Sequence, residues 1–177
     1  EQNLEHTVAA GPIPAVNMDT GYASLIDEAT RLEVLQRTNA LTSGLEFVAG
    51  VFVGDSPGQK FDADAYRHGI TETEAASGTP ILFQSFGLSE LQEDEVAPAY
   101  ESVTLSCGPF LFFELGEAFV PFGRIYSLDT YEQLMQIPNA IGAKHSSLRR
   151  QPEWRRIELR DRVRPEFKVF TGNDLAI

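Results

Sequence analysis

An alternation of strand-like and helix-like segments constrains the fold of this chain more than any other feature. Six short apolar segments, several of them rich in Val, Ile or Phe, predict buried strands. They are Pro12–Asn17, Phe47–Val53, Pro80–Ser85, Phe110–Leu115, Ala140–Lys144 and Phe167–Thr171. They recur roughly every 30 residues, which is the length of one βα unit. Parallel strands that alternate with helices build either an open doubly wound sheet or a closed barrel.

Five helix-like stretches occupy the gaps between these strands. They are Asp27–Asn39, Ala63–Ser77, Glu90–Leu105, Leu128–Gln136 and Glu153–Val163. In the first stretch, Ala29, Leu32 and Leu35 recur at helical spacing, and acidic residues occupy the first turn. Ser89 is a candidate N-cap for the third stretch, and Pro98 predicts a kink or a break within it.

The sequence favours an α/β fold of the (β/α)8 TIM barrel type over an open sheet. No G-x-G-x-x-G or G-x-x-x-x-G-K-[ST] stretch marks a nucleotide site. Polar residues instead stand at the carboxyl ends of nearly all the expected strands: Asp19-Thr20, Asp55, Gln84-Ser85, Glu114, Lys144-His145-Ser146 and Asn173-Asp174. Site residues that converge from several strand ends are typical of the barrel. Since only about six of the eight βα units are present, we expect residues 1–177 to form a single catalytic barrel domain within a longer chain.

Composition and charge exclude several kinds of partner. The chain has 177 residues and a formal net charge of −12, which argues against nucleic acid and membrane surfaces because both attract basic proteins. Its apolar runs are too short to span a bilayer. The single cysteine, Cys107, cannot form an internal disulfide and fits a reducing compartment. We therefore expect a cytoplasmic protein.

Lys144 is the strongest candidate for a reactive residue. It ends a short apolar strand in a chain that has only three lysines, at positions 60, 144 and 168, against eleven arginines. An arginine carries a surface charge equally well, but only a lysine can lose its proton in an apolar pocket and attack a carbonyl carbon. The alternative is a lysine whose stem packs at a strand end while its ammonium group stays in water.

Several segments, in collinear order, resemble one known family. Ile137–Ser147 resembles a Pro-Asn-x-x-Gly-x-Lys-x-Ser signature around a Schiff-base lysine. Three further segments are similar to the second, third and seventh strands of the same family: Pro12–Tyr22, with Asp19-Thr20-Gly21 in place of a Thr-Thr-Gly turn, Phe47–Val51 and Phe167–Asp174. On these residues the chain resembles the dihydrodipicolinate synthase and N-acetylneuraminate lyase family of class I aldolase barrels. On this alignment, strand one, strand eight and the C-terminal helices lie outside residues 1–177.

The resemblance implies a lyase or hydro-lyase that acts on a 2-oxo acid or a sugar acid through an imine at Lys144. It also implies that no metal or nucleotide cofactor is needed, and that the protein is a homo-oligomer, either a dimer or a tetramer. Two tyrosines of the family's proton relay are missing, since one falls at Phe113 or Glu114 and the other near Phe86. Two alternatives therefore stay open: a repurposed or non-enzymatic barrel of the same family, and an α/β small-molecule binding domain.

Several polar residues are candidate partners of Lys144. Glu114 ends an aromatic strand, and we expect it to replace the missing tyrosine as a proton-transfer group; the alternative is a structural carboxylate paired with an arginine. Thr20 would relay a proton or, with the turn amides around Gly21, bind the substrate carboxylate, unless it only caps the turn. Arg124 is the nearest match to the family's arginine for the substrate carboxylate.

The remaining candidates are expected to contact substrate. Asp19 would bind substrate hydroxyls or a metal, and Ser146 belongs to the lysine signature. Asn173 and Asp174 end the last expected strand and would bind hydroxyls or form a turn. His145 follows the lysine directly and points to the opposite face of the strand, so we expect it to be packed.

Two further patterns concern charged groups. No metal site is expected, because the histidines show no ligand spacing such as H-x-x-x-H and the lone cysteine has no partners. Seven of the eleven arginines fall within Arg149–Arg164. We expect them to form the solvated outer face of a barrel helix, and the alternative is a site for a phosphate or an acidic partner.

Overall fold

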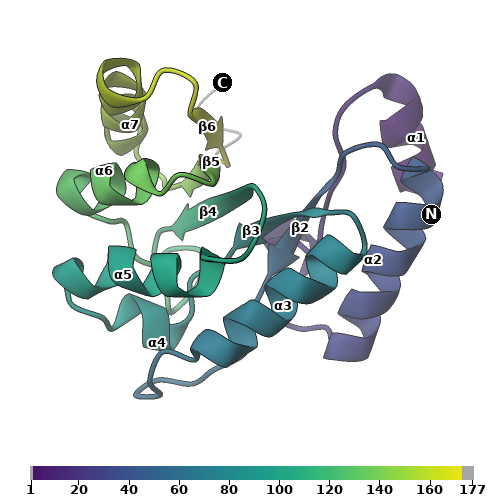
Figure 1. The fold of residues 1–177 in the computed structure, drawn as a ribbon, viewed down its shortest axis with the longest axis horizontal. Helices are drawn as coiled ribbons and strands as arrows, with labels where there is room; N and C mark the ends of the chain where they lie inside the picture. Colours follow the sequence, from purple (N-terminus) through teal and green to yellow (C-terminus); the bar gives the residue numbers. More distant parts are fainter. Residues whose placement is uncertain (1, 173–177) are drawn as a thin grey trace.

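The structure is a computed structural model that describes residues 2–172, and it contains one six-stranded parallel sheet (Figure 1). The strands are β1 (Ala15–Val16), β2 (Val48–Val51), β3 (Thr79–Leu82), β4 (Phe110–Leu115), β5 (Ala140–Ser146) and β6 (Lys168–Thr171). Each neighbouring pair is parallel, and the order of the strands in the sheet follows their order in the sequence. All six strands predicted from the sequence are present. The prediction that all six are buried is wrong for β1, which is only two residues long, and for β6, because neither strand has a buried residue.

The strand order decides between an open sheet and a barrel. In a doubly wound sheet the order reverses at one point and helices cover both faces. Here each strand lies beside the one before it, and right-handed crossovers then place the helices on the same side of the sheet. Figure 1 shows the helices as an arc outside the strands. The chain is therefore a half-barrel, which confirms the barrel prediction and rules out the doubly wound sheet.

Seven α-helices and one short 3-10 helix lie within residues 2–172. They are α1 (Gln2–Ala10), the 3-10 helix η1 (Asp19–Gly21), α2 (Glu28–Thr42), α3 (Ala63–Ala75), α4 (Phe86–Ser89), α5 (Glu93–Thr104), α6 (Leu128–Gln136) and α7 (Arg150–Val163). The five helices predicted from the sequence are confirmed as α2, α3, α5, α6 and α7. Across the described part of the chain, no helix combines the length and the apolar character needed to cross a bilayer.

Two local predictions for the third helix concern its N-cap and Pro98, and the predicted N-cap is wrong. Ser89 does not cap it but ends the short helix α4, and α5 begins after Gln92 instead. The backbone N–H of Gln92 donates to Glu95 Oε2 at 2.9 Å, which is one half of a capping box. Pro98 lies inside α5 without ending it. Buried residues on both sides of Pro98, including Val96, hold the helix against the core, so packing outweighs the local cost of the proline.

Apolar side chains cover both faces of the sheet. Between the strands and the helices, Phe112 of β4 is fully buried, and its ring centre lies 5.1 Å from that of Tyr131 and 5.8 Å from that of Phe167. The concave inner face carries a smaller buried cluster, Met18, Ile81, Phe83, Leu111, Phe113 and Leu115. The alternation of side chains along β4 explains the division, because Phe112 points outward while Leu111 and Phe113 point inward.

The outer core generates a test of the fold. Replacement of Phe112 by Ala should lower the free energy of unfolding by about 3–5 kcal/mol, because it leaves a cavity where three aromatic rings meet. Replacement of Phe119 by Ala, which removes a ring that is already 42% exposed, should cost less than about 1 kcal/mol. Urea denaturation of both variants measures the difference. Equal losses would mean that Phe112 is not at the centre of the core.

Candidate active site

Lys144 lies near the carboxyl end of β5 and points to the concave face of the sheet. Its Nζ is 2.7 Å from Asp19 Oδ1 and 4.1 Å from the centre of the Phe113 ring. The strand register places Lys144 between Phe113 of β4 and Phe170 of β6. The lysine side chain is only 17% exposed, so its amine sits among an aromatic ring, a carboxylate and the open concave face.

A cavity of about 330 Å³ lies on the concave face beside Lys144. Most of its wall is apolar and includes Met18, Ile81 and Leu111, while Thr20 supplies a hydroxyl. Ligand sites combine an apolar wall with a few polar groups, and this cavity is within their usual range of size. The lysine amine therefore borders a mainly apolar space along the inner face of the sheet.

The turn after β1 brings Asp19 to the lysine. Asp19, Thr20 and Gly21 form η1, and the backbone N–H of Gly21 donates to Met18 O at 3.0 Å. The sequence placed all three residues near Lys144. The structure puts the Asp19 carboxylate against the amine and Thr20 on the cavity wall. The Gly21 amide is used within the turn, so it is not free to bind a substrate carboxylate.

Ser146 and Gly172 lie close to the lysine side chain. Ser146 lies two residues after Lys144 on the same face of β5, and its buried Oγ has no hydrogen-bond partner among residues 2–172. A Cβ atom on Gly172 would overlap Ser146 Oγ and would lie 2.8 Å from Lys144 Cε. A glycine at this position therefore leaves room for both side chains. The predicted site residues Asn173 and Asp174 lie outside the described residues.

Glu114 lies on the other face of the sheet, in the layer between the strands and the helices. Its carboxylate accepts hydrogen bonds from Arg156 Nη2 at 2.7 Å and from the backbone N–H of Tyr126 at 2.9 Å, and it is 2.8 Å from His145 Nδ1. Phe113, the residue before Glu114, faces the lysine, and because side chains alternate along a strand Glu114 points to the opposite face. This placement contradicts the proton-transfer role predicted for Glu114 and matches the alternative, a structural carboxylate paired with an arginine.

The environment of Glu114 keeps its carboxylate ionised. Burial by itself would raise the pKa of Glu114, because a charge is poorly solvated inside the protein. The hydrogen bonds from His145 and Arg156, and their electrostatic attraction, outweigh burial and hold the pKa of Glu114 below its ordinary value. Arg156 is accordingly buried, which corrects the expectation that the whole arginine-rich stretch faces solvent.

His145 is packed, as the sequence predicted. Its ring is fully buried, with Nδ1 against Glu114 and Nε2 2.9 Å from Ser147 Oγ. Phe113, rather than Glu114, takes the inward position at which the family resemblance expected a tyrosine. The sequence resemblance fitted either position, although strand alternation relative to Lys144 was a signal that could have separated them. A phenylalanine has no hydroxyl group and cannot relay a proton.

Arg124 does not line the cavity beside Lys144. Its guanidinium donates to Ser89 O at 3.0 Å and to Leu91 O at 2.6 Å, and it forms an ion pair with Glu93. These contacts join the end of α4 to the start of α5. They contradict the predicted role of Arg124 as the partner of the substrate carboxylate, because its donors are already used at a different place in the fold.

Solved structures of dihydrodipicolinate synthase family proteins and of a sialic acid aldolase have a similar fold. Dihydrodipicolinate synthase from Bacteroides thetaiotaomicron matches with a TM-score of 0.80 and 16% identity, over 97% of this chain and 55% of that chain. YagE, a prophage protein of the dihydrodipicolinic acid synthase family from E. coli K12, matches with a TM-score of 0.79 and 15% identity, over 97% and 55%. The sialic acid aldolase of Ruminococcus gnavus matches with a TM-score of 0.74 and 16% identity, over 95% and 53%.

This chain has the fold of the dihydrodipicolinate synthase and N-acetylneuraminate lyase barrels. It spans just over half the length of these proteins, 53–55% in the three comparisons above. No family model and no curated protein sequence matches the chain. The resemblance carried by the lysine signature is therefore confirmed at the level of the fold.

The buried carboxylate generates a prediction about acid stability. Since the folded pKa of Glu114 lies below its ordinary value of 4.5, its contribution to stability is fully present above pH 4.5 and is lost as the pH falls through the folded pKa. Glu114→Gln should lower the free energy of unfolding at pH 7 by about 3–5 kcal/mol, because it leaves Arg156 buried without its partner. The deficit should shrink on acidification below pH 4.5.

Denaturation of wild type and variant at several pH values measures this deficit. Glu117→Gln, which changes an exposed carboxylate after the same strand, serves as the control and should leave stability nearly unchanged. A deficit for Glu114→Gln that stayed constant from pH 7 to pH 3 would contradict a lowered pKa.

Proposed function

We propose that this chain carries the imine-forming site of a class I aldolase-type lyase, with Lys144 as the nucleophile and a small 2-oxo acid or sugar acid as the substrate. One observation carries the proposal: a lysine amine on the wall of the concave cavity, 2.7 Å from a carboxylate, near the carboxyl end of a barrel strand. Active sites of such barrels lie at the carboxyl ends of the strands. The YagE structure, which was solved in complex with pyruvate, supports a 2-oxo acid as the class of substrate.

The proposed reaction begins at the lysine amine. Neutral Lys144 Nζ adds to the keto carbon of the substrate and forms a carbinolamine, which loses water to give an iminium ion. The iminium draws the electron pair from a neighbouring carbon–carbon or carbon–hydrogen bond, and that bond breaks. The electron pair leaves the lysine adduct as an enamine, and the other fragment departs as a proton or as an aldehyde whose hydroxyl proton passes to a base. The enamine carbon then takes a proton, or adds to an aldehyde, which regenerates an iminium ion. Hydrolysis of that ion consumes one water, releases the product and restores the amine. This chemistry requires no metal or nucleotide.

Asp19 is the proposed proton acceptor for Lys144. While the two side chains form an ion pair, the ammonium group has no free electron pair and cannot attack a carbonyl. The Asp19 carboxylate is the group in hydrogen-bond contact with Nζ, so it can take this proton and return it to the carbinolamine oxygen as water leaves. The proposed donors to the substrate carboxylate are Thr20, on the cavity wall, and Ser146, whose Oγ has no hydrogen-bond partner among residues 2–172.

A repurposed barrel is the second candidate. Two observations favour it: Phe113 has no hydroxyl at the inward position, and Glu114 faces away from the cavity. In such a barrel the ion pair between Lys144 and Asp19 would only hold β5 against the turn after β1. The two candidates differ in one measurable property, which is whether Lys144 forms an imine.

Imine trapping tests the leading proposal. The protein is incubated with pyruvate, reduced with borohydride, digested and mapped by mass spectrometry. We expect one reduced adduct on Lys144, because imine formation requires a primary amine that can reach the keto carbon. Lys144→Arg should abolish the adduct.

Lys168 offers a matched control. It lines the same cavity from β6, so Lys168→Arg removes a second amine from the same wall and should leave trapping on Lys144 unchanged. An adduct found only on Lys168, or no adduct with pyruvate or a panel of other 2-oxo acids from folded protein, would instead favour the repurposed barrel.

A second experiment isolates the role of Asp19. Asp19→Asn keeps the shape of the side chain but removes its capacity to accept a proton, and the rate of trapping on Lys144 should fall by about 10²–10⁴-fold. Asp19→Glu should recover part of the loss. Asp64→Asn, which changes an exposed aspartate on α3, should have no effect. If Asp19→Asn trapped substrate at the rate of wild type, another group would have to accept the proton.

A further inference from the structure

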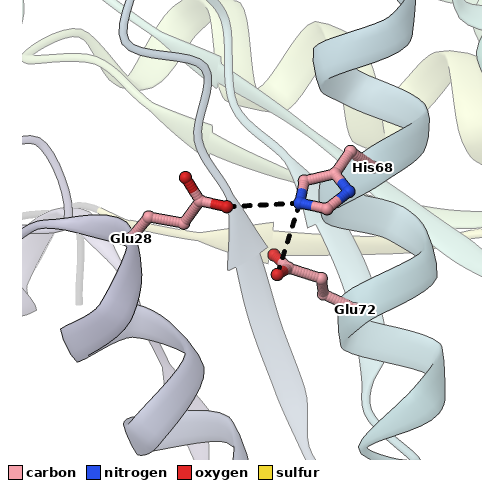
Figure 2. A group of neighbouring side chains, drawn as sticks. All are labelled: Glu28, His68 and Glu72. Carbon is pink, nitrogen blue, oxygen red and sulfur yellow. Dashed lines mark hydrogen bonds and ion pairs between the residues drawn. The ribbon is translucent and has the colours of Figure 1, made fainter.

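A second cluster of polar side chains lies between α2 and α3, away from the lysine cavity. Figure 2 shows Glu28, from the first turn of α2, pointing toward His68 and Glu72 of α3. We propose that Glu28, His68 and Glu72 bind a divalent transition-metal ion, with Zn²⁺ as the best fit. This proposal is independent of the imine chemistry at Lys144.

The spacing of the three side chains carries the proposal. His68 Nε2 lies 3.2 Å from Glu28 Oε1 and 3.4 Å from Glu72 Oε1, and the three ligand atoms lie within 4.8 Å of one another. Zinc binds nitrogen and oxygen ligands at about 2.0–2.2 Å in a tetrahedron, which separates any two ligand atoms by about 3.3–3.5 Å. Two of the separations are already close to this value, and the third, between the two carboxylates, is no more than 4.8 Å.

The local structure favours this arrangement before any ion binds. His68 and Glu72 are four residues apart on α3, so they share one face of the helix. Glu28 is held in the first turn of α2, where Asp27 caps the helix by accepting a hydrogen bond from Thr30 N at 2.8 Å. The side chains of His68 and Glu28 are 63% and 65% exposed, so an ion can reach them from solvent.

A cavity beside Glu28, His68 and Glu72 supports a bound ion independently of their spacing. It encloses about 310 Å³, and the three ligands line it together with Asn17. Asn17 is only 6% exposed, and its Oδ1 has no hydrogen-bond partner among residues 2–172, although its Nδ2 donates to Arg31 O. A buried acceptor without a donor is costly unless a bound group supplies one. With three protein ligands, the ion keeps a fourth position for a water or a ligand in this cavity, and a metal-bound water is a donor of the required kind.

Two positively charged residues, Arg31 and Lys60, also line the cavity. The Arg31 guanidinium is held by Ile26 O at 2.7 Å and by Ala23 O at 3.4 Å. Lys60 is the other cation, and it lies on the segment before α3. The carboxylates of Glu28 and Glu72 together balance the double charge of a divalent ion, so the three-ligand site is neutral when occupied.

No metal site was expected from the sequence, because the histidines show no spacing such as H-x-x-x-H and the lone cysteine has no partners. The ligands here are an H-x-x-x-E pair and a glutamate forty residues earlier in the chain than the histidine. Without an ion, the same side chains form a surface ion pair, which contributes little to stability. The two interpretations differ in whether the cluster binds metal stoichiometrically.

Metal titration distinguishes them. Protein freed of metal by a chelator, which is then removed, is titrated with Zn²⁺ by calorimetry and with Co²⁺ by visible absorption. We expect one equivalent of Zn²⁺ to bind and Co²⁺ to give the intense visible bands of a four-coordinate site. His68→Ala and Glu72→Gln should each weaken binding by about tenfold or more, because loss of a supporting partner alone weakens metal sites by about 10–100-fold.

Matched variants control for binding elsewhere. His6→Ala removes another exposed histidine, and Glu33→Gln removes another exposed glutamate of α2, so neither should change the affinity. Saturating Zn²⁺ should also raise the melting temperature of wild type but not of His68→Ala. Two outcomes would overturn the proposal: wild type that binds no Zn²⁺ beyond the level of His68→Ala, or His6→Ala that weakens binding as much as His68→Ala does.

Discussion

Strand alternation across β4 and β5 is the constraint on which the rest of this structure depends. Each face of the sheet carries its own apolar cluster, so each successive side chain must suit either the concave face or the helix layer. Along β5, Lys144 faces inward and His145 outward; along β4, Phe113 faces inward and Glu114 outward. A shift of register by one residue would exchange these roles and would bury the lysine among the helices.

The outer network also positions the inner site. In the register of β4 and β5, Phe113 pairs with Lys144 and the next pair is Glu114 with His145. The contact between the Glu114 carboxylate and His145 is therefore one residue along the strands from the contact between the Phe113 ring and the lysine amine. Arg156 adds α7 to this network through two hydrogen bonds to Glu114. A buried ion pair is weak evidence for stability, since desolvation offsets much of the attraction. What it does is join α7 to the outer face of β4 and β5, through Glu114 and its neighbour His145.

The arginine-rich stretch illustrates how a single pattern divides into several roles. Arg156 is buried against Glu114, whereas Arg164 donates to the carbonyl oxygens of Met135 and Ile137, at the end of α6. Both residues join α7 and its C-terminal boundary to neighbouring elements. A solvated basic face was expected from charge density, but guanidinium groups also bind backbone carbonyls that a helix end leaves without partners.

The sequence by itself determined the six strands, the five principal helices and the barrel class, and it identified Lys144 as the strongest candidate for a reactive residue. These features depend on local periodicity and on residue types that neighbour one another in the chain. Only the tertiary structure decided the partners of the lysine, because Asp19 lies 125 positions away from it. It also decided that Glu114 and Arg124 make structural contacts, and that Glu28 meets His68 and Glu72. Such contacts depend on strand register and on helix placement, which local patterns do not encode.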